Sequence, residues 1–122
     1  MPVNGAVTYP STQDASILQC VWICTTGVPD GSPLECPEWA DRTVQAIGTF
    51  GGATCTMEGS NDGTNWAPLS NAAGGAAATF TVAGIKTLIE NPRFIRPNLT
   101  VVGAGATITV TLLNRRANPM RT

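Results

Sequence analysis

Four cysteines carry the most distinctive chemistry in this chain. They stand at Cys20, Cys24, Cys36 and Cys55, with three, eleven and eighteen residues between successive members. A structural zinc site needs two close pairs of ligands, and the chain has no His to replace a missing cysteine. We therefore expect no metal site. An even count also allows two disulfides, but no secretory signal precedes the cysteines, so reduced thiols are the expectation.

The stretch EGSNDGTNW, residues 58–66, gathers side chains with oxygen atoms. Such a loop could coordinate calcium, but calcium loops combine several carboxylates, and Asp62 is the only one within the turn. Asn and Asp bond their own backbone and tolerate left-handed conformations, while Gly supplies a positive φ. We therefore expect a hairpin at Asn61, Asp62 and Gly63, with the large apolar body of Trp66 packed beneath it.

Catalytic residues are not expected. The absence of His removes the usual general base and the common triads, and the four Asp and four Glu are scattered without a close pair. Carboxylates from distant segments could still converge in the fold. The run Gly103 to Ala106 lacks the further Gly, the Lys and the following helix of a phosphate loop. We therefore predict that the protein is not an enzyme and needs no cofactor.

The elements that must position these residues are β-strands, because apolar and polar residues alternate with a period of two. In 107–112, Ile, Val and Leu alternate with Thr, and 78–82 alternates in the same way, with Val82 on the apolar side. In 52–58, Cys55 falls on the apolar side and is expected to be a small core residue. Each segment predicts a half-buried antiparallel strand with a threonine-rich outer face.

Further strands are expected at 15–23, 42–50 and 93–102, and Pro97 should occupy an edge or a bulge because it cannot donate a ladder hydrogen bond. Residues 83–90 are the one helical candidate, but a Gly and a following Pro favour a turn or a strand. Turn-forming residues separate these segments. The fold class predicted is all-β, an antiparallel β-sandwich or jelly roll. We expect an extended N-terminal arm at 1–14, one domain at 15–116 and a short tail at 117–122.

Four residues are candidates for contact with a partner protein: Trp22, Trp39, Arg93 and Arg96. The strand around Trp22 is apolar on both faces, which would follow if another subunit covered one of them. Arg93 and Arg96 lie on a strand where their heads are expected either to pair with Glu58, Glu90 or Asp62 or to contact a partner. The connection 24–40 is long enough to reach a neighbouring molecule.

Charge excludes other kinds of partner. Charged residues make up 12 % of the chain and the net charge is −1, so we expect neither nucleic acid nor a membrane surface as a partner. No apolar run is long enough to span a bilayer. A surface with so few charges suits a protein packed against other subunits. The threonine-rich outer faces could pack on another sheet without strong aggregation.

Two segments carry a family resemblance. They are ADRTVQAIGTFGGATCTMEGSNDGTNWAPL, residues 40–69, and ENPRFIRPNLTVVGAGATITVTLLNRR, residues 90–116. The order and spacing of DRTVQ, GTFG, the 58–66 stretch and PRFIRP resemble small structural proteins of tailed-bacteriophage virions, usually described as capsid decoration or cement proteins. The pairing of DGTNW with RFIRP is also similar to discoidin-type galactose-binding jelly rolls. Both resemblances imply a β-sandwich.

The first resemblance implies a capsid decoration subunit on the outside of a bacteriophage head. It would be made in the host cytoplasm and would bind the major capsid protein and copies of itself, as a dimer or a trimer, to stabilise the shell. Such a role needs a rigid scaffold and multivalent contacts. The alternative is a carbohydrate-binding or adhesin-like module of a phage tail or baseplate, with Asp62, Asn65 and Trp66 at the sugar site.

Overall fold

The computed structural model describes residues 6–8, 17–35 and 39–116, and these residues form ten β-strands and no helix. Accordingly, the described chain holds no helix of the length and apolarity that crossing a membrane requires. The strands are β1 (Ala6–Thr8), β2 (Ile17–Thr25), β3 (Leu34–Glu35), β4 (Trp39–Thr49), β5 (Thr54–Ser60), β6 (Ala67–Pro68), β7 (Thr79–Phe80), β8 (Gly84–Leu88), β9 (Phe94–Val101) and β10 (Thr107–Arg116).

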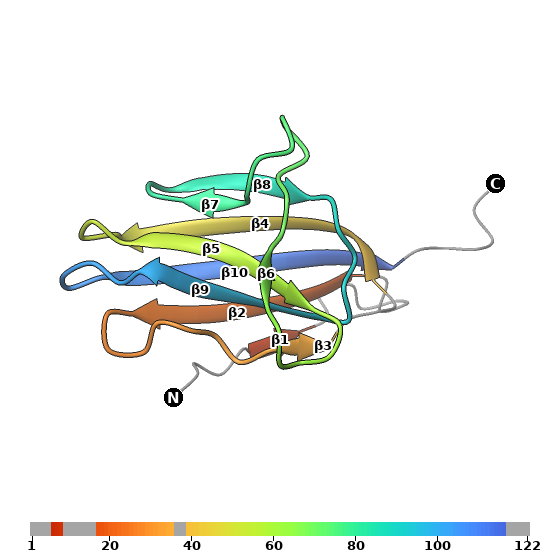
Figure 1. The fold of residues 1–122 in the computed structure, drawn as a ribbon, viewed down its shortest axis with the longest axis horizontal. Coiled ribbons are helices and arrows are strands. Elements are labelled where there is room, and N and C mark those ends of the chain that lie inside the picture. The colour runs from red at the N-terminus through yellow and green to blue at the C-terminus, as the bar shows by residue number, and fades with distance from the viewer. Residues whose placement is uncertain (1–5, 9–16, 36–38, 117–122) are drawn as a thin grey trace.

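The strands form two antiparallel sheets. Sheet 1 has the order β1-β2-β10-β4-β8, and sheet 2 has the order β3-β9-β5-β6, with β7 also paired to β5. The long strands of both sheets run in nearly the same direction and overlap in Figure 1, as in aligned sandwich packing. The predicted all-β sandwich is confirmed, and the finer jelly-roll topology stays a prediction.

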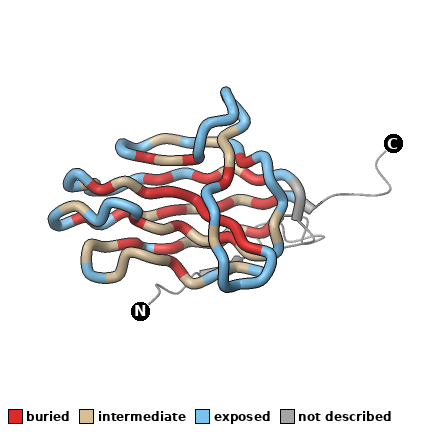
Figure 2. Tube along the Cα trace, viewed as in Figure 1, coloured by how far each residue is buried: buried red, intermediate tan, exposed pale blue. Residues whose placement is uncertain are grey.

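The core lies between the sheets because alternate residues of each long strand point inward. On β10 these are Ile108, Val110 and Leu112, all with no exposed surface, and the intervening threonines face outward. Burial of one such aliphatic side chain stabilises the fold by roughly 1.5–3 kcal/mol. In Figure 2 the buried residues run along the middle of the strands, and the exposed residues gather in the connections at both ends.

A buried polar group closes one end of this core. Arg42 is fully buried and donates from Nε to Oδ1 of Asn114 at 3.0 Å and from Nη1 to the carbonyl of Glu90 at 3.3 Å. Asn114 in turn donates to the carbonyl of Leu18 at 3.5 Å. The contacts join β4, β10, β2 and the β8–β9 connection. A buried charge is tolerated in such a place only when its hydrogen bonds are made.

Several strand boundaries differ from those predicted. β2 continues to residue 25 rather than ending at 23, while residues 15 and 16 of the predicted strand lie outside the described part, and β7 covers residues 79–80 rather than 78–82. Val82, expected on the inner face, is 70 % exposed because the chain bends at 81–83 before β8 begins. The segment 83–90, the helical candidate, contains β8, so the preference for a strand is confirmed.

Pro97 illustrates how β9 accommodates a residue without an N–H group. It lies opposite Met57 of β5, but the N–H and carbonyl of Met57 bond to Ala78 and Leu69 on the other side. The nitrogen of Pro97 therefore faces away from β5. On that side its neighbour is the irregular segment at 29–31, and Gly31 donates to the Pro97 carbonyl at 2.9 Å.

The described part of the long connection, 26–35, lies against the edge of sheet 2 instead of projecting toward a neighbour. Trp22 donates from Nε1 to the carbonyl of Ser32 at 2.8 Å, and Leu99 donates to the carbonyl of Pro29 at 3.0 Å. A Cβ added to Gly31 would lie 2.6 Å from Trp22 Cδ1 and 2.7 Å from Pro97 Cδ. Only glycine allows this close approach. Residues 36–38 lie outside the described part.

Part of the predicted N-terminal arm belongs to the sandwich. Residues 6–8 form β1, which pairs with β2 through Ala6 opposite Val21 and Thr8 opposite Gln19. The remainder of the predicted arm and the predicted tail at 117–122 lie outside the described residues. β1 therefore adds an edge strand to sheet 1 beside β2.

Candidate interaction surfaces

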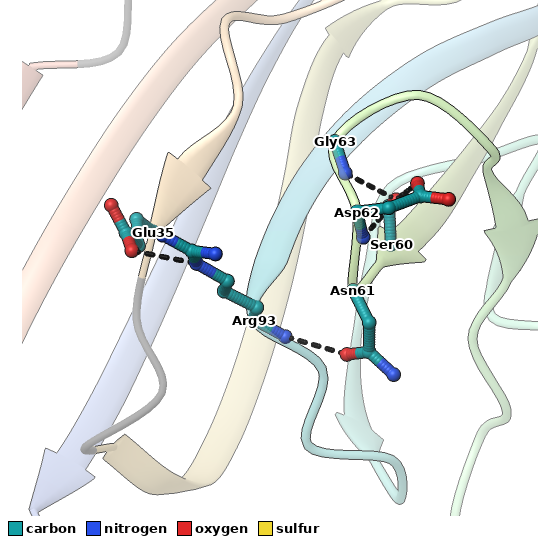
Figure 3. A network of polar contacts seen from close by, with 6 residues as sticks. All are labelled: Glu35, Ser60, Asn61, Asp62, Gly63 and Arg93. Carbon is teal, nitrogen blue, oxygen red and sulfur yellow. Dashed lines mark hydrogen bonds and ion pairs between the residues drawn. The ribbon is translucent and has the colours of Figure 1, made fainter.

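The predicted hairpin forms at the end of β5, at residues 60–65, with Gly63 at a φ of 77°. Asp62 accepts hydrogen bonds from the N–H groups of Thr64 and Asn65 and from Ser60 Oγ, all at 2.8 Å on Oδ1. Asn65 Nδ2 donates to the second oxygen, Oδ2, also at 2.8 Å. Figure 3 shows Ser60, Asp62 and Gly63 in this turn. The turn prediction is confirmed.

The hydrogen bonds that Asp62 accepts stabilise its charged form. The backbone N–H groups of Asn65 and Thr64 contribute most, and together with the side chains of Asn65 and Ser60 they hold the pKa of Asp62 far below its usual range. Both carboxylate oxygens are thus committed to the turn. Within the described residues, no three His, Cys, Asp or Glu side chains come together as metal ligands.

Arg96 is held in place on the outer side of sheet 2. Its guanidinium lies 3.1 Å from Glu58 Oε1 and 3.7 Å from Asp30 Oδ2, and it stacks over the ring of Trp66 at 4.2 Å. Asn98 donates to the second oxygen of Glu58 at 3.3 Å. The predicted pairing with Glu58 is confirmed. Trp66 is half-buried beneath this guanidinium, so the hairpin tryptophan supports the sheet rather than forming an open platform.

Arg93 has a more exposed position at the start of β9. Its Nε donates to Glu35 Oε2 at 2.8 Å, with both side chains about half exposed, and its backbone N–H donates to Asn61 Oδ1 at 3.0 Å (Figure 3). The partner is Glu35 rather than the acids suggested by sequence. Because the pair is solvated, it contributes about 0–1 kcal/mol to stability.

The two tryptophan candidates differ in their surroundings. Trp22 has no exposed surface: it lies in the core against the 26–35 segment and is not available to a partner. The sequence pattern misled because Trp22 and its neighbour Ile23 point to opposite faces, and it is Ile23 that faces solvent. Trp39 begins β4, and its side chain lies outside the described residues.

Two of the described cysteines, Cys24 and Cys55, are buried free thiols. Cys20, Cys24 and Cys55 are all in the core, as expected for Cys55, and Cys36 lies outside the described residues. Burial raises the pKa of Cys24 and of Cys55 to about 12, with smaller contributions from Asp30 at Cys24 and from Cys24 and Glu58 at Cys55. These thiols are therefore packing residues without nucleophilic character at neutral pH.

A hollow of about 360 Å³ opens beside the hairpin. Its polar lining includes Asn61, Asn65, Glu90 and Asn91, and its apolar lining includes Leu69 and two prolines. Glu90 accepts hydrogen bonds from the N–H and Oγ of Ser70, both at 2.6 Å, and these bonds lower its pKa. The hollow therefore presents amide groups and a fixed carboxylate above an apolar floor.

The outer side of sheet 1 is a continuous surface, which we call the neutral face. The strand registers place its residues in three central rows across neighbouring strands. From one end to the other these are Ile23–Thr109–Ile47, Val21–Thr111–Gln45–Ile85 and Gln19–Leu113–Thr43–Thr87. All are isoleucine, valine, leucine, threonine or glutamine. Among the described side chains of the central rows, none is charged.

One further row of residues lies at each end of the neutral face. At one end lie Thr25, Thr107 and Thr49, and at the other end lie Ile17, Arg115 and Asp41. Arg115 and Asp41 are opposite in sign and occupy neighbouring strands. The described face therefore has no net charge.

The neutral face is open to solvent in the single chain. Ile23 and Ile47 are each 48 % exposed and Ile85 is 66 % exposed. A hollow of about 290 Å³ lies among the central rows, next to Thr111 and Leu113. Exposed isoleucines that share one face of a sheet form an apolar patch, and such patches mark interaction sites on soluble proteins.

Sequence reasoning identifies part of this surface. The alternation indicates the apolar outer side of the Trp22 strand and the threonine faces, but it does not single out Ile47, Gln45 or Ile85. Their signal is weak because β4 and β8 come from separate segments, and only the strand order places them beside β10 and β2. A period-two pattern identifies which residues share one face of a strand, not which strands are neighbours.

Comparison with known proteins adds no relative: no family model, no curated protein and no solved structure gives a significant match to the chain. A function for this protein therefore has to be inferred from the chemistry of its surfaces.

Proposed function

We propose that this protein is a structural subunit of a virion, a capsid decoration protein that binds the outer surface of a bacteriophage head. In this role the neutral face is covered by protein in the assembled particle. The observation that carries the proposal is this face: a rigid sheet surface with three uncharged central rows and exposed isoleucines. The sequence resemblance to tailed-phage structural proteins supplies the biological setting.

Physical chemistry favours protein as the material that covers this face. Threonine hydroxyls and isoleucine side chains lose little on leaving water compared with charged groups, so the three uncharged central rows cost little free energy to desolvate. Its strands are already ordered by the sandwich, so little conformational entropy is lost when a partner binds. On a capsid lattice with many identical binding sites, several weak contacts made at once would hold the protein on the head more tightly than one contact alone.

Retention on purified heads tests this function. Heads of the phage that encodes the chain, stripped of the protein, should bind the added wild type and retain it through sedimentation. Thr109→Lys places a charge within the central rows of the neutral face and should reduce retention at least tenfold. Val101→Lys is the matched control, because Val101 lies on sheet 2 and is 52 % exposed. Failure of the wild type to bind heads at any concentration would contradict the proposal.

A second candidate function is supported by the hollow beside the hairpin. Its amides and carboxylate are of the kind that hydrogen-bond sugar hydroxyls, and its volume suits a small ligand. Of the three residues that the resemblance places at a sugar site, only Asn65 lines the hollow, whereas Asp62 and Trp66 are engaged in the turn and with Arg96.

Titration with host-surface oligosaccharides, followed by NMR, tests this candidate. Asn65→Ala and Asn91→Ala should abolish shifts that the wild type shows, and Thr64→Ala, a change at an exposed loop residue outside the lining, should preserve them. The absence of any wild-type shift would remove carbohydrate binding from consideration and leave the decoration proposal standing.

A further inference from the structure

We propose that a second copy of this chain covers the neutral face, packed sheet against sheet as a two-fold symmetric dimer. The inference rests on the proposed function in one respect, namely that the neutral face is an assembly surface, and it adds the identity of the partner. A two-fold dimer brings the same surface of both molecules together, so the surface must be complementary to itself. The arrangement of residues on the neutral face meets this requirement.

The charges provide the first test of self-complementarity. Arg115 of β10 and Asp41 of β4 lie in one row, on the two central strands of the β2-β10-β4-β8 set. A two-fold axis that runs along the strands between β10 and β4 exchanges these two strands. Arg115 of each copy then faces Asp41 of the other, and opposite charges meet at both places. A face with charges of one sign would repel its own copy.

The uncharged rows meet the same requirement. With that axis, β2 of one copy faces β8 of the other. Each row of one copy then faces the same row of the second copy, read in the opposite direction across the strands. In the idealised register Ile85 meets Val21, an apolar pair, and Thr111 meets Gln45, a pair that can hydrogen-bond. Leu113 meets Thr43, Thr109 meets Ile47, Thr107 meets Thr49 and Gln19 meets Thr87, and the β2 residues of the three-residue rows lie at the edge of the contact. No charged side chain of the described face is opposed by an apolar one.

The size of the face sets the expected affinity. Residues on one side of a sheet are about 6.8 Å apart along a strand and strands are about 4.8 Å apart, so each position covers about 33 Å². The rows hold seventeen positions, and the face therefore covers about 550 Å² per molecule. Standard stable interfaces bury about 800 Å² per partner. We therefore expect a weak, concentration-dependent dimer that the lattice of a particle would reinforce.

Sedimentation velocity over a series from low micromolar to millimolar protein measures the dimer directly. The wild type should shift from monomer to dimer within this range. Ile85→Lys places a charge opposite Val21 in each half of the dimer and should weaken association at least tenfold. Val101→Lys, on sheet 2, should leave it unchanged. A wild type that stays monomeric throughout the range, or a dimer that Ile85→Lys does not weaken, would overturn the inference.

A charge exchange between two variants tests the axis itself. Asp41→Arg and Arg115→Asp should each associate more weakly than the wild type, because like charges then meet across the interface. Mixed in equal amounts, they should form a heterodimer in which the two positive charges of one chain meet the two negative charges of the other. The pairs within each chain are the same in the mixture as in the separate samples. Mixing that restores no association would contradict this geometry.

The two proposals fail separately. The wild type could be monomeric in solution and still need the neutral face for retention on heads. This result would indicate that a capsid protein, rather than a second copy of the chain, covers the face. A dimer that depends on the neutral face but never binds heads would support the dimer and contradict the decoration function.

Discussion

Gly31→Ala should destabilise the protein because the 26–35 segment approaches the core too closely for any side chain. The added Cβ would lie 2.6 Å from Trp22 Cδ1 and 2.7 Å from Pro97 Cδ, and both belong to rigid, fully buried rings. Overpacking of this kind costs about 1–3 kcal/mol. For a chain of this size, about 2 kcal/mol corresponds to a fall of about 8 °C in Tm.

Gly27→Ala is the matched control on the same connection, because a Cβ there would meet nothing within 4 Å and the residue has no positive φ. This change should be neutral or stabilise by up to about 1 kcal/mol, since alanine restricts the unfolded chain. Urea unfolding followed by tryptophan fluorescence, with circular dichroism on heating, measures both variants. Equal stabilities of the two variants would refute the close packing of Gly31 on Trp22 and Pro97.

Three further outcomes are expected. Burial raises the pKa values of the Cys24 and Cys55 thiols to about 12, so both should resist iodoacetamide at pH 8 in the native protein and react in urea. Peptide mass spectrometry measures the alkylation, and rapid alkylation of either thiol in the native protein would contradict its burial. Asp62→Ala should lower the Tm at pH 7. The folded-state pKa of Asp62 lies below its unfolded value, so the Tm difference between wild type and variant should be complete above about pH 5 and disappear as the pH falls through the folded-state pKa. A Tm difference that persists unchanged to the most acid pH would show that the charged form of Asp62 is not its cause. A double-mutant cycle with Glu58→Gln and Arg96→Met should give a coupling of about 1 kcal/mol in urea unfolding, and additive effects would show that the pair contributes nothing.

The fold class followed from the sequence because period-two alternation is a local property. In β10, Ile108, Val110 and Leu112 point inward as their spacing predicts, and the Asn61–Gly63 turn is specified by residues that are adjacent in the chain. Strand ends were less predictable. β7 is short because the chain must bend at 81–83 to enter sheet 1 as β8, and this requirement comes from topology rather than from the alternation itself.

The candidate surfaces were predictable only in part. Glu58 was one of three acids that the sequence offered to Arg96, whereas Asp30, the second partner of Arg96, comes from a connection whose path the sequence does not indicate. The burial of Trp22 depends on Gly31, which allows the connection to lie on its ring. The neutral face depends on the order of strands in sheet 1, which local periodicity does not encode.

Residue-level protection shows whether the neutral face is covered in the assembled state. Hydroxyl-radical footprinting of Ile23, Ile47 and Ile85 should give strong labelling in dilute monomer, where these side chains are 48 %, 48 % and 66 % exposed. In the assembled state, at high concentration or on heads, we predict that labelling of all three falls sharply while Val101 on sheet 2 keeps its labelling. Equal labelling of the three isoleucines in dilute and assembled protein would contradict the account.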